Sequence, residues 1–465
     1  MTTPATAPVR RSTFDENEPP SIRLINECVH CGFCLPTCPT YSLWNEEMDS
    51  PRGRIYLMKL GLEGKTDMTD KFVGHFDKCL GCMACMTACP SGVQYGKLIE
   101  ATRAQLERNY PRSPFDRLFR DLIFALFPHP NRLRFALLPL WFYQHSGLRW
   151  LVHHLGLIQL VPPQLQAMEA LLPELSLRGM FSGLPLRIPA IGPQRRRVGL
   201  LLGCVQRVFF DDVNAATARV LAAEGCEVII PRNQGCCGAL MTHAGRASEA
   251  RVAARHLIET FERARVDTIV INAAGCGSNM KEYGYLLRDD PFYSRRAAAF
   301  ASKCRDISEV LDELEPRAAR HPVPLRVAYH DSCHLQHAQQ IRTQPRSVLS
   351  TIPGLELVEL ADSAICCGSA GIYNLVEPAP ADELGRRKVQ SVIDADVDAL
   401  VSSNPGCLLQ IGKGLKKAGH PIPTMHMVEL LDASIRGRML RVHRPHNSHP
   451  ARTEEFAVPQ ETLRL

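Results

Sequence analysis

The second half of the chain alternates short apolar, β-branched runs with longer amphipathic segments. In the first group, strands are expected at 198–204, 226–233 and 267–276, and helices at 214–225 and 251–266. The alternation then returns, with strands expected at 326–334, 355–360 and 399–407 and a helix at 382–395. Because this alternation is typical of parallel α/β units, residues from about 197 onward are expected to form a duplicated α/β domain with parallel sheets.

The first half of the chain has helical periodicity instead. Apolar residues recur at helical spacing at Ile55, Leu57, Met58 and Leu60. A break of this helix is expected at Gly61. The most apolar region, 121–165, is interrupted by prolines, histidines and arginines before about 20 apolar residues accumulate, so no transmembrane helix is expected. Residues 101–150 carry eight Arg against three acidic residues, which fits either a basic helical linker or a peripheral membrane contact.

Composition narrows the function classes. The net charge is +6 over 465 residues without a basic and aromatic pattern, so nucleic-acid binding is not expected. Residues 1–20 lack the apolar stretch of a secretory signal and are expected to be a disordered tail. The chain has 18 cysteines, and in the reducing cytoplasm expected for it, clustered cysteines indicate metal ligands or redox thiols more often than disulfides.

Eight of the cysteines form two runs with one spacing, Cys-x2-Cys-x2-Cys-x3-Cys-Pro. The first run is Cys28, Cys31, Cys34 and Cys38, and the second is Cys79, Cys82, Cys85 and Cys89. In this bacterial ferredoxin pattern the fourth cysteine ligates the other cluster. Two [4Fe–4S] clusters are therefore predicted, one on Cys28, Cys31, Cys34 and Cys89 and the other on Cys79, Cys82, Cys85 and Cys38. Zinc usually takes pairs of Cys-x2-4-Cys, four ligands per ion, which explains two complete runs less well.

The residues beside the first run leave one question open. In "PRGR", Arg52 and Arg54 could face a cluster or an acidic partner, or they could form a solvated helix start.

Eight further cysteines fall in register across the duplication. Cys204, Cys236, Cys237 and Cys276 correspond to Cys333, Cys366, Cys367 and Cys407, at offsets of 129 to 131 residues. Each Cys-Cys pair is followed by glycine, and the outer cysteines are expected at the carboxyl ends of strands, where open α/β sheets build their sites. These eight are candidate ligands of an additional iron–sulfur cluster or candidate redox thiols. Cys226 and Cys304 remain as ordinary buried cysteines.

Together these motifs resemble the iron–sulfur subunits of membrane-linked dehydrogenases. The stretches "CVHCGFCLPTCPTY", "DSPRGRIYLMK", "GCGSNMKEYG" and "CCGSAGIYNL" are most similar to the glycolate oxidase iron–sulfur subunit. The wider group includes anaerobic glycerol-3-phosphate dehydrogenase, lactate-utilisation proteins and heterodisulfide reductase. The resemblance implies an electron-transfer subunit, with glycolate oxidised to glyoxylate on separate FAD-containing subunits and electrons passed to a respiratory acceptor, a quinone.

Further expectations concern a flavin site, catalytic residues, the identity of the electron donor and membrane association. No FAD site is expected in this chain, since "GKGLKKAG" has Lys417 where a dinucleotide fingerprint needs its third glycine. No residue is assigned to catalysis on the carbon substrate. Lactate or glycerol-3-phosphate could replace glycolate as the donor, and a thiol/disulfide enzyme at the Cys-Cys-Gly repeats is a further hypothesis. Membrane association, if any, would be at the inner face of the cell membrane.

The chain departs from the heterodisulfide reductase pattern at the end of each repeat. That type has Cys-x-x-Cys there, whereas this chain has "CGSN" at 276–279 and "CLLQ" at 407–410. Histidines surround Cys333, at His330, His334 and His337. One of them could replace a missing cysteine as a ligand, as in Rieske centres, or they could belong to an ordinary strand end and helix start.

The sequence thus predicts six segments. They are a disordered tail (1–20), a two-cluster ferredoxin domain (21–110), a basic leucine-rich helical linker (111–196), a first Cys-Cys-Gly repeat (197–320), a second Cys-Cys-Gly repeat (321–440) and a polar tail (441–465).

Overall fold

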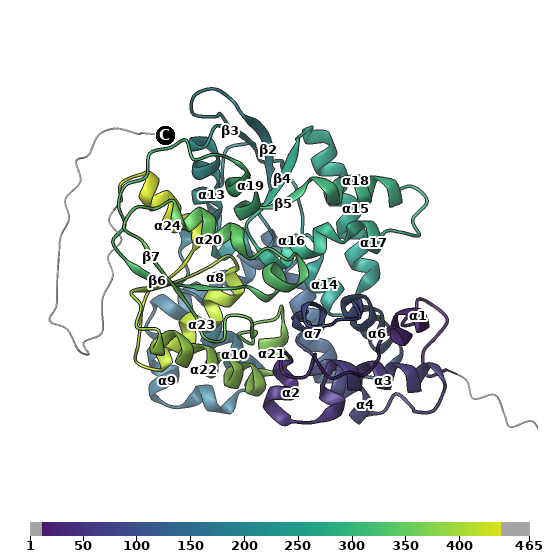
Figure 1. Cartoon of the computed structure of the whole chain (residues 1–465). Coiled ribbons are helices and arrows are strands. Elements are labelled where there is room, and N and C mark those ends of the chain that lie inside the picture. The colour runs from purple at the N-terminus through teal and green to yellow at the C-terminus, as the bar shows by residue number, and fades with distance from the viewer. Residues whose placement is uncertain (1–11, 439–465) are drawn as a thin grey trace, which may run out of the picture.

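The computed structural model describes residues 12–438, so the expectations for residues 1–11 and for the tail at 441–465 lie outside the described residues. A helical N-terminal domain, dark purple in Figure 1, lies against a larger body that contains two sheets. This is the predicted arrangement of a helix-rich domain followed by a duplicated, mostly parallel α/β domain.

Six short helices form the N-terminal domain. They are α1 (Ile22–Asn26), α2 (Pro39–Trp44), α3 (Pro51–Leu62), α4 (Asp70–Asp77), α5 (Ala84–Thr87) and α6 (Tyr95–Asn109), with a 3-10 turn η1 (Glu47–Asp49). Helix α3 is the helix predicted around 55–60. It begins with Pro51 at its first position and Ser50 as a cap that accepts a hydrogen bond from the Gly53 amide. The predicted helix is present, but it is not broken at Gly61, since it continues to Leu62.

Residues 12–20 are ordered, unlike the expected disordered tail. Phe14 is 4% exposed and packs on Phe72 and on the face of α3 at Gly61, where a Cβ would lie 2.7 Å from the Phe14 ring. Asp15 accepts hydrogen bonds from Arg108, 2.9 Å from its Nη2. The buried Phe14 ring and the hydrogen bonds of Asp15 therefore anchor this segment, and Gly61 makes room for the ring rather than ending the helix.

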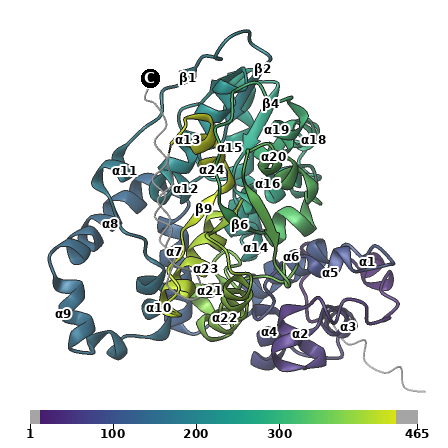
Figure 2. The same cartoon turned by 60° about the vertical axis from the view of Figure 1, so that its left-hand side comes forward.

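The linker is helical, as predicted. It contains α7 (Pro114–Leu126), α8 (Pro130–His145), α9 (Leu148–His154), η2 (Leu157–Leu160), α10 (Pro163–Leu171) and α11 (Leu177–Phe181). Helix α7 packs on the body through Phe119, Ile123 and Phe124. Helix α8 is anchored by Leu133 and Leu137, which are buried in a cluster with Val208 of the first repeat, whereas α9 has no buried residue and lies at the outer edge (Figure 2). Within residues 12–438, each helix is too short or too polar to cross a membrane.

The first sheet has the order β1-β3-β2-β4-β5. Its strands are β1 (Arg187–Ile188), β2 (Arg196–Leu200), β3 (Cys226–Ile229), β4 (Thr268–Ile271) and β5 (Cys304–Asp306), all parallel except β1. The connecting helices include α13 (Asp211–Ala223), α14 (Ala239–His243), α15 (Ala247–Ala264), α16 (Ala274–Lys281), α18 (Ser294–Lys303) and α19 (Ile307–Glu313). Cys226 and Cys304 are fully buried in their strands, as expected.

The second sheet repeats this core with the order β7-β6-β8-β9, all parallel. Its strands are β6 (Arg326–His330), β7 (Glu356–Glu359), β8 (Ala399–Ser402) and β9 (Thr424–His426). Its helical segments are η3 (His334–Ala338, a π-helical turn), α20 (Thr343–Ser350), α21 (Tyr373–Val376), α22 (Pro378–Asp394), α23 (Pro405–Lys417) and α24 (Met427–Ile435). β1, β5 and β9 are two or three residues long, too short to give a periodic signal in the sequence.

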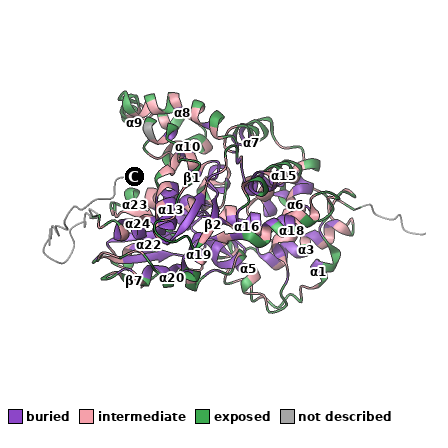
Figure 3. Ribbon diagram, turned by 90° about the horizontal axis from the view of Figure 1, so that it is seen from above, coloured by how far each residue is buried: buried purple, intermediate pink, exposed green. Residues whose placement is uncertain are grey.

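The two repeats share one hydrophobic core. Helix α24 of the second repeat packs on α13 of the first, and α19 of the first packs on α20 of the second. An Arg219–Asp432 ion pair of 2.7 Å joins α13 to α24. Seen from above, the strands and the helix faces against them form the buried centre of the molecule (Figure 3). The repeats therefore hold each other's cysteine loops in a fixed relation.

Candidate iron–sulfur and metal centres

Four of the eight ferredoxin-type cysteines lie at the outer end of the N-terminal domain. We call Cys28, Cys31, Cys34 and Cys89 the first cysteine set; Cys31 is exposed and the other three are partly buried. Burial raises the pKa of Cys28, and the charges of the Cys89 and Cys31 thiols add to this effect. A surface pocket is lined by this set and by Cys85. The fold thus brings Cys89 to the loop of the first run.

The loop of the first run is kept tight by a glycine. Gly32 has a φ of +88°, and a Cβ at this position would lie 2.9 Å from Nη1 of Arg52. Arg52 in turn pairs with Glu47, at 2.6 Å from Nε to Oε1. The glycine therefore allows a left-handed turn and a close approach of the guanidinium to the cysteine loop.

The other four cysteines lie deeper. We call Cys38, Cys79, Cys82 and Cys85 the second cysteine set, and each is 6–8% exposed. Burial, and after it the thiols of Cys82, Cys79 and Cys38, raises the pKa of Cys85 well above its usual range. Cys38 is thus grouped with the second run. The loop of the second run contains two residues in the left-handed conformation, Gly81 (φ +62°) and Met83 (φ +62°). This grouping is the one the crossed ferredoxin pattern requires.

Two arginines face the second cysteine set. Arg54 is 1% exposed and donates hydrogen bonds to the His75 carbonyl at 2.5 Å and to Thr40 Oγ1 at 3.1 Å. Burial opposes ionisation of the Cys79 thiol, but Arg54 and Arg103 outweigh burial and lower its pKa. Arg54 is therefore no solvated helix start: of the two interpretations open from the sequence, it takes the one that faces a cluster site.

The first repeat brings its predicted cysteines together. Cys236 Sγ lies 3.3 Å from Cys204 Sγ, and a hydrogen bond from Cys236 followed by burial raises the pKa of Cys204. Cys237 is 2% exposed, and its carbonyl accepts hydrogen bonds from Asn279 and Tyr283. Cys276 lies in the first turn of α16 rather than at the end of the preceding strand.

The second repeat gathers its cysteines around a histidine. Cys333 Sγ and Cys366 Sγ lie 3.9 Å apart, and Cys367 and Cys407 are 1% and 2% exposed. Ligand atoms of His330, Cys367 and Cys407 all lie within 4.8 Å of one another. Hydrogen bonds from Cys366 and Cys407, and the His330 ring, lower the pKa of Cys367. Cys407, like Cys276, lies in the first turn of a helix, α23.

The second cysteine set and the second repeat meet directly. Leu80, Cys82, Cys333 and Cys366 belong to one buried cluster, and burial together with Cys333 raises the pKa of Cys82. Thr87 Oγ1 lies 2.7 Å from His337 Nδ1, which ties α5 to η3. The second cysteine set is therefore covered by the second repeat, whereas the first set faces outward.

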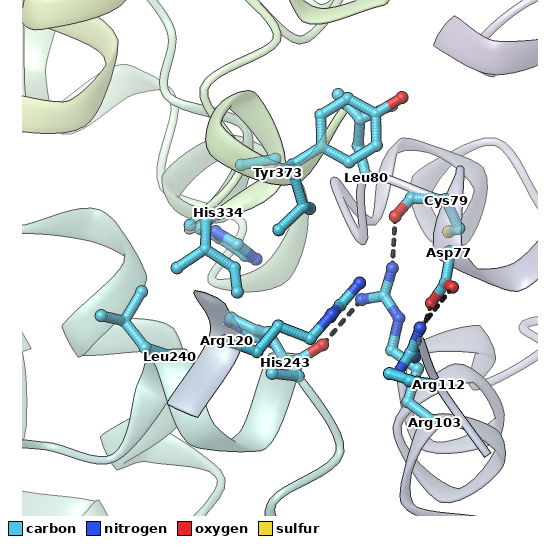
Figure 4. Close-up of a pocket in the computed structure, with 15 residues that line it drawn as sticks. Asp77, Cys79, Leu80, Arg103, Arg112, Arg120, Leu240, His243, His334 and Tyr373 are labelled. Carbon is cyan, nitrogen blue, oxygen red and sulfur yellow. Dashed lines mark hydrogen bonds and ion pairs between the residues drawn. The ribbon is translucent and has the colours of Figure 1, made fainter. Parts of the chain in front are cut away.

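A cavity of about 50 Å³ lies where the N-terminal domain meets both repeats (Figure 4). Its walls include Cys79, Arg103, Arg120, and His243 from the first repeat against Tyr373 from the second. His243 and Tyr373 occupy equivalent positions, each six residues after the second cysteine of its pair. Arg103 closes one side, donating hydrogen bonds to the carbonyls of His243 at 2.9 Å and of Cys79. A space of this size holds water molecules rather than an aromatic ring.

Two stacked imidazoles form another wall of this cavity. The rings of His243 and His334 lie 4.8 Å apart and are nearly parallel at 6°. Burial and the neighbouring His243 lower the pKa of His334 to about 3, so its ring is neutral at physiological pH. Neither the contact of Arg103 with His243 nor this ring pair stood out in the sequence, because each joins residues more than 90 positions apart along the chain.

Known protein families match along most of the chain. Residues 24–93 match a 4Fe-4S dicluster domain, residues 115–172 match the linker region of the glycolate oxidase iron–sulfur subunit, and residues 198–281 and 327–412 match a cysteine-rich domain. The chain is 39% identical over 427 residues to the probable glycolate oxidase iron–sulfur subunit of Bacillus subtilis, covering 90% of this chain and 95% of that protein. The chain belongs to the glycolate oxidase iron–sulfur subunit family.

Other relatives support the assignment to the glycolate oxidase iron–sulfur subunit family. The Escherichia coli glycolate oxidase iron–sulfur subunit is 34% identical over 417 residues, 89% of this chain and 94% of that protein. Lactate utilization protein A of an Exiguobacterium strain is 34% identical over 240 residues, 51% of this chain and 98% of that protein. The resemblance proposed from the sequence is thus confirmed, and the eight ferredoxin-type cysteines fall within the segment that matches the dicluster domain.

Proposed function

We propose that this chain is the electron-transfer subunit of a glycolate oxidase complex. Glycolate is oxidised to glyoxylate on separate FAD-containing subunits, releasing two electrons and two protons, and the electrons leave one at a time through this chain to a respiratory acceptor, a quinone. The observation that carries the proposal is the pair of adjacent four-cysteine sets, one at the surface and one buried against the second repeat. The FAD subunits, the acceptor and the absence of FAD from this chain rest on the family.

The two cysteine sets fit two [4Fe–4S] clusters. The first set would hold one and the second set the other, while the repeat cysteines stay candidates for a further cluster or for redox thiols. Such a cluster takes up and gives back one electron at a time. The protein's part is to exclude water from the second set, to place Arg54 and Arg103 beside Cys79, and to leave the first set accessible.

The electrons are proposed to enter at the first cysteine set. Val29 and Phe33, which flank Cys31, are 68% and 66% exposed, so an apolar surface surrounds this loop. Exposed apolar side chains next to a redox centre suit a partner that must approach closely. The direction is then from the flavin subunit to the first set, and on to the second set.

The donor decides between this proposal and its alternatives. The native complex, purified through a tag on this chain, is expected to contain an FAD subunit, iron and acid-labile sulfide. With an artificial dye as acceptor it should oxidise glycolate at least about tenfold faster than lactate or glycerol-3-phosphate, since a site built for one substrate's polar groups discriminates strongly. Faster oxidation of one of the other two would assign the chain to that dehydrogenase, and a preparation without iron or without an FAD subunit contradicts the proposal.

We also propose that α8, α9 and η2 rest on an anionic membrane surface. Their exposed side chains include Phe135, Phe142, Trp150, Leu155 and Leu160, which are 58–80% exposed. From residue 122 to residue 168 the sequence has three arginines and no acidic residue. Aromatic and leucine side chains beside arginines favour the headgroup region of a bilayer that carries negative charge. This supports the peripheral membrane contact that was one of the two alternatives for the linker.

Vesicle binding tests this surface. Full-length protein should co-sediment with phosphatidylglycerol-containing vesicles and release at high salt. The double substitution Trp150→Ser and Leu155→Ser should weaken binding by more than tenfold, since each apolar side chain contributes about 1.5–3 kcal/mol on burial. The control is Phe292→Ser, which removes a ring that is 80% exposed in the loop before α18. If the double variant still binds vesicles but loses the FAD subunit, the surface is a subunit interface instead.

A further inference from the structure

The second repeat has a buried imidazole that its own hydrogen bonds do not explain. His330 is 1% exposed at the end of β6, and its Nδ1 has no hydrogen-bond partner among the described residues. An unpaired buried ring nitrogen costs free energy unless something else binds it. The atoms beside it are thiol sulfurs, since ligand atoms of His330, Cys367 and Cys407 lie within 4.8 Å of one another.

These separations suit a single metal ion. Around a tetrahedral zinc ion, with Zn–S of about 2.3 Å and Zn–N of about 2.0–2.1 Å, neighbouring ligand atoms are separated by about 3.5–3.8 Å. The trio of His330, Cys367 and Cys407 would have to close by only about 1 Å to reach this geometry. A cube of four irons places its ligand sulfurs further apart, because each sulfur binds a different corner.

A candidate fourth thiol and a compensating charge lie beside the trio. The thiol of Cys366 interacts with that of Cys367, and Cys333 Sγ lies 3.9 Å from Cys366 Sγ, so either thiol would move toward the trio to become the fourth ligand. Lys388 is 2% exposed on α22, and its charge acts on Cys367, Cys366 and Cys407. Zinc bound to three thiolates and one imidazole carries a net charge of −1, which this buried ammonium balances.

The first repeat lacks counterparts of both the buried histidine and the buried lysine. Leu201 takes the place of His330, three residues before the corresponding cysteine, and Leu257 and Ile258 occupy the part of α15 that corresponds to Lys388. Its Cys276 is also only partly buried. The two repeats therefore differ in the features that would hold a metal ion, although their cysteines are in register.

We propose that the second repeat binds one zinc ion through His330, Cys367, Cys407 and one of the thiols of Cys333 and Cys366. The ion would fix the loops against which the second cysteine set packs. It would carry no electrons, because zinc has no accessible second oxidation state. This site does not depend on which donor the complex oxidises.

Metal analysis of the full-length protein, purified without chelators, tests the site. Zinc should be present at about one ion per chain, and X-ray absorption should give about three sulfurs at 2.3 Å and one nitrogen at 2.0–2.1 Å. His330→Leu should lower zinc affinity by more than about 100-fold in competition with a chelator, more than loss of an outer-shell partner costs. Cys407→Ala should do the same, while its counterpart Cys276→Ala keeps the zinc and serves as the matched control.

Three results would overturn the proposal. The first is wild-type protein without zinc whose repeat thiols all react with a thiol reagent. The second is loss of about four irons with their sulfide in Cys407→Ala, which would show a cluster in place of a single ion. The third is unchanged zinc affinity in His330→Leu, which would remove the imidazole from the site. The metal content of folded variants, checked by circular dichroism, gives each answer without an activity assay.

Discussion

Cys38→Ala is expected to remove the cluster of the second run while leaving the cluster of its own run in place. The reason is that Cys38 lies with Cys79, Cys82 and Cys85, 6–8% exposed, whereas Cys89 and Cys31 both act on Cys28. Iron should fall from about eight to about four per chain, since each cluster holds four irons. The EPR spectrum of the reduced variant should match that of Cys82→Ala, which loses the second cluster. It should lack the second-cluster signal, which Cys31→Ala retains.

The control for Cys38→Ala is Cys226→Ala, which removes a fully buried thiol from β3 without touching either set. It should keep all eight irons, about four per cluster. The complementary variant, Cys89→Ala, should reproduce the spectrum of Cys31→Ala. If Cys38→Ala instead resembles Cys31→Ala, each run holds its own cluster and the crossed assignment is wrong.

Local spacing explains why so much of this protein could be predicted from its sequence. The two cysteine runs and the strand–helix alternation are short-range patterns, and both the dicluster domain and the duplicated sheets follow from them. The register of the repeat cysteines likewise placed Cys204 beside Cys236 and Cys333 beside Cys366. What the spacing could not give was which side chains from distant segments surround these sets.

The three histidines around Cys333 show this limit. They are neighbours in the sequence, yet His330 lies with Cys367 and Cys407, His334 stacks on His243, and His337 hydrogen-bonds to Thr87. Each partner comes from a segment fixed by tertiary packing. The sequence left open whether a histidine replaces a missing cysteine, and the position of His330 gives that hypothesis a specific residue.

Arg54→Met is expected to lower the midpoint potential of the second cluster on the order of 100 mV. Adding an electron to a cluster adds negative charge, and a buried guanidinium in a low-dielectric site stabilises that charge by about 2–3 kcal/mol at separations of several ångströms. For a one-electron couple, 59 mV corresponds to about 1.4 kcal/mol. Arg54 is 1% exposed and lowers the pKa of Cys79, so it acts on this set with little screening from water.

The measurement for Arg54→Met is an EPR-monitored redox titration, begun after iron analysis shows that both clusters are retained. Arg54→Lys keeps the charge and should recover most of the potential, although its single ammonium cannot donate to both the His75 carbonyl and Thr40 in the same geometry. Arg52→Met is the matched control, because Arg52 lies beside the first run and its side chain is 29% exposed. It should shift only the first cluster, and by less, because water screens its charge.

If Arg54→Met loses the second cluster, its midpoint potential cannot be measured, and a milder variant is used to test the effect of charge. Arg103→Met removes the other cation beside Cys79 and leaves the Arg54 hydrogen bonds in place. It should lower the second potential in the same direction. An unchanged second potential in both variants, with iron retained, would show that the two arginines serve packing and not the redox balance. Because both arginines act on Cys79 of the second cysteine set, their effect is expected to favour transfer from the exposed first set inward.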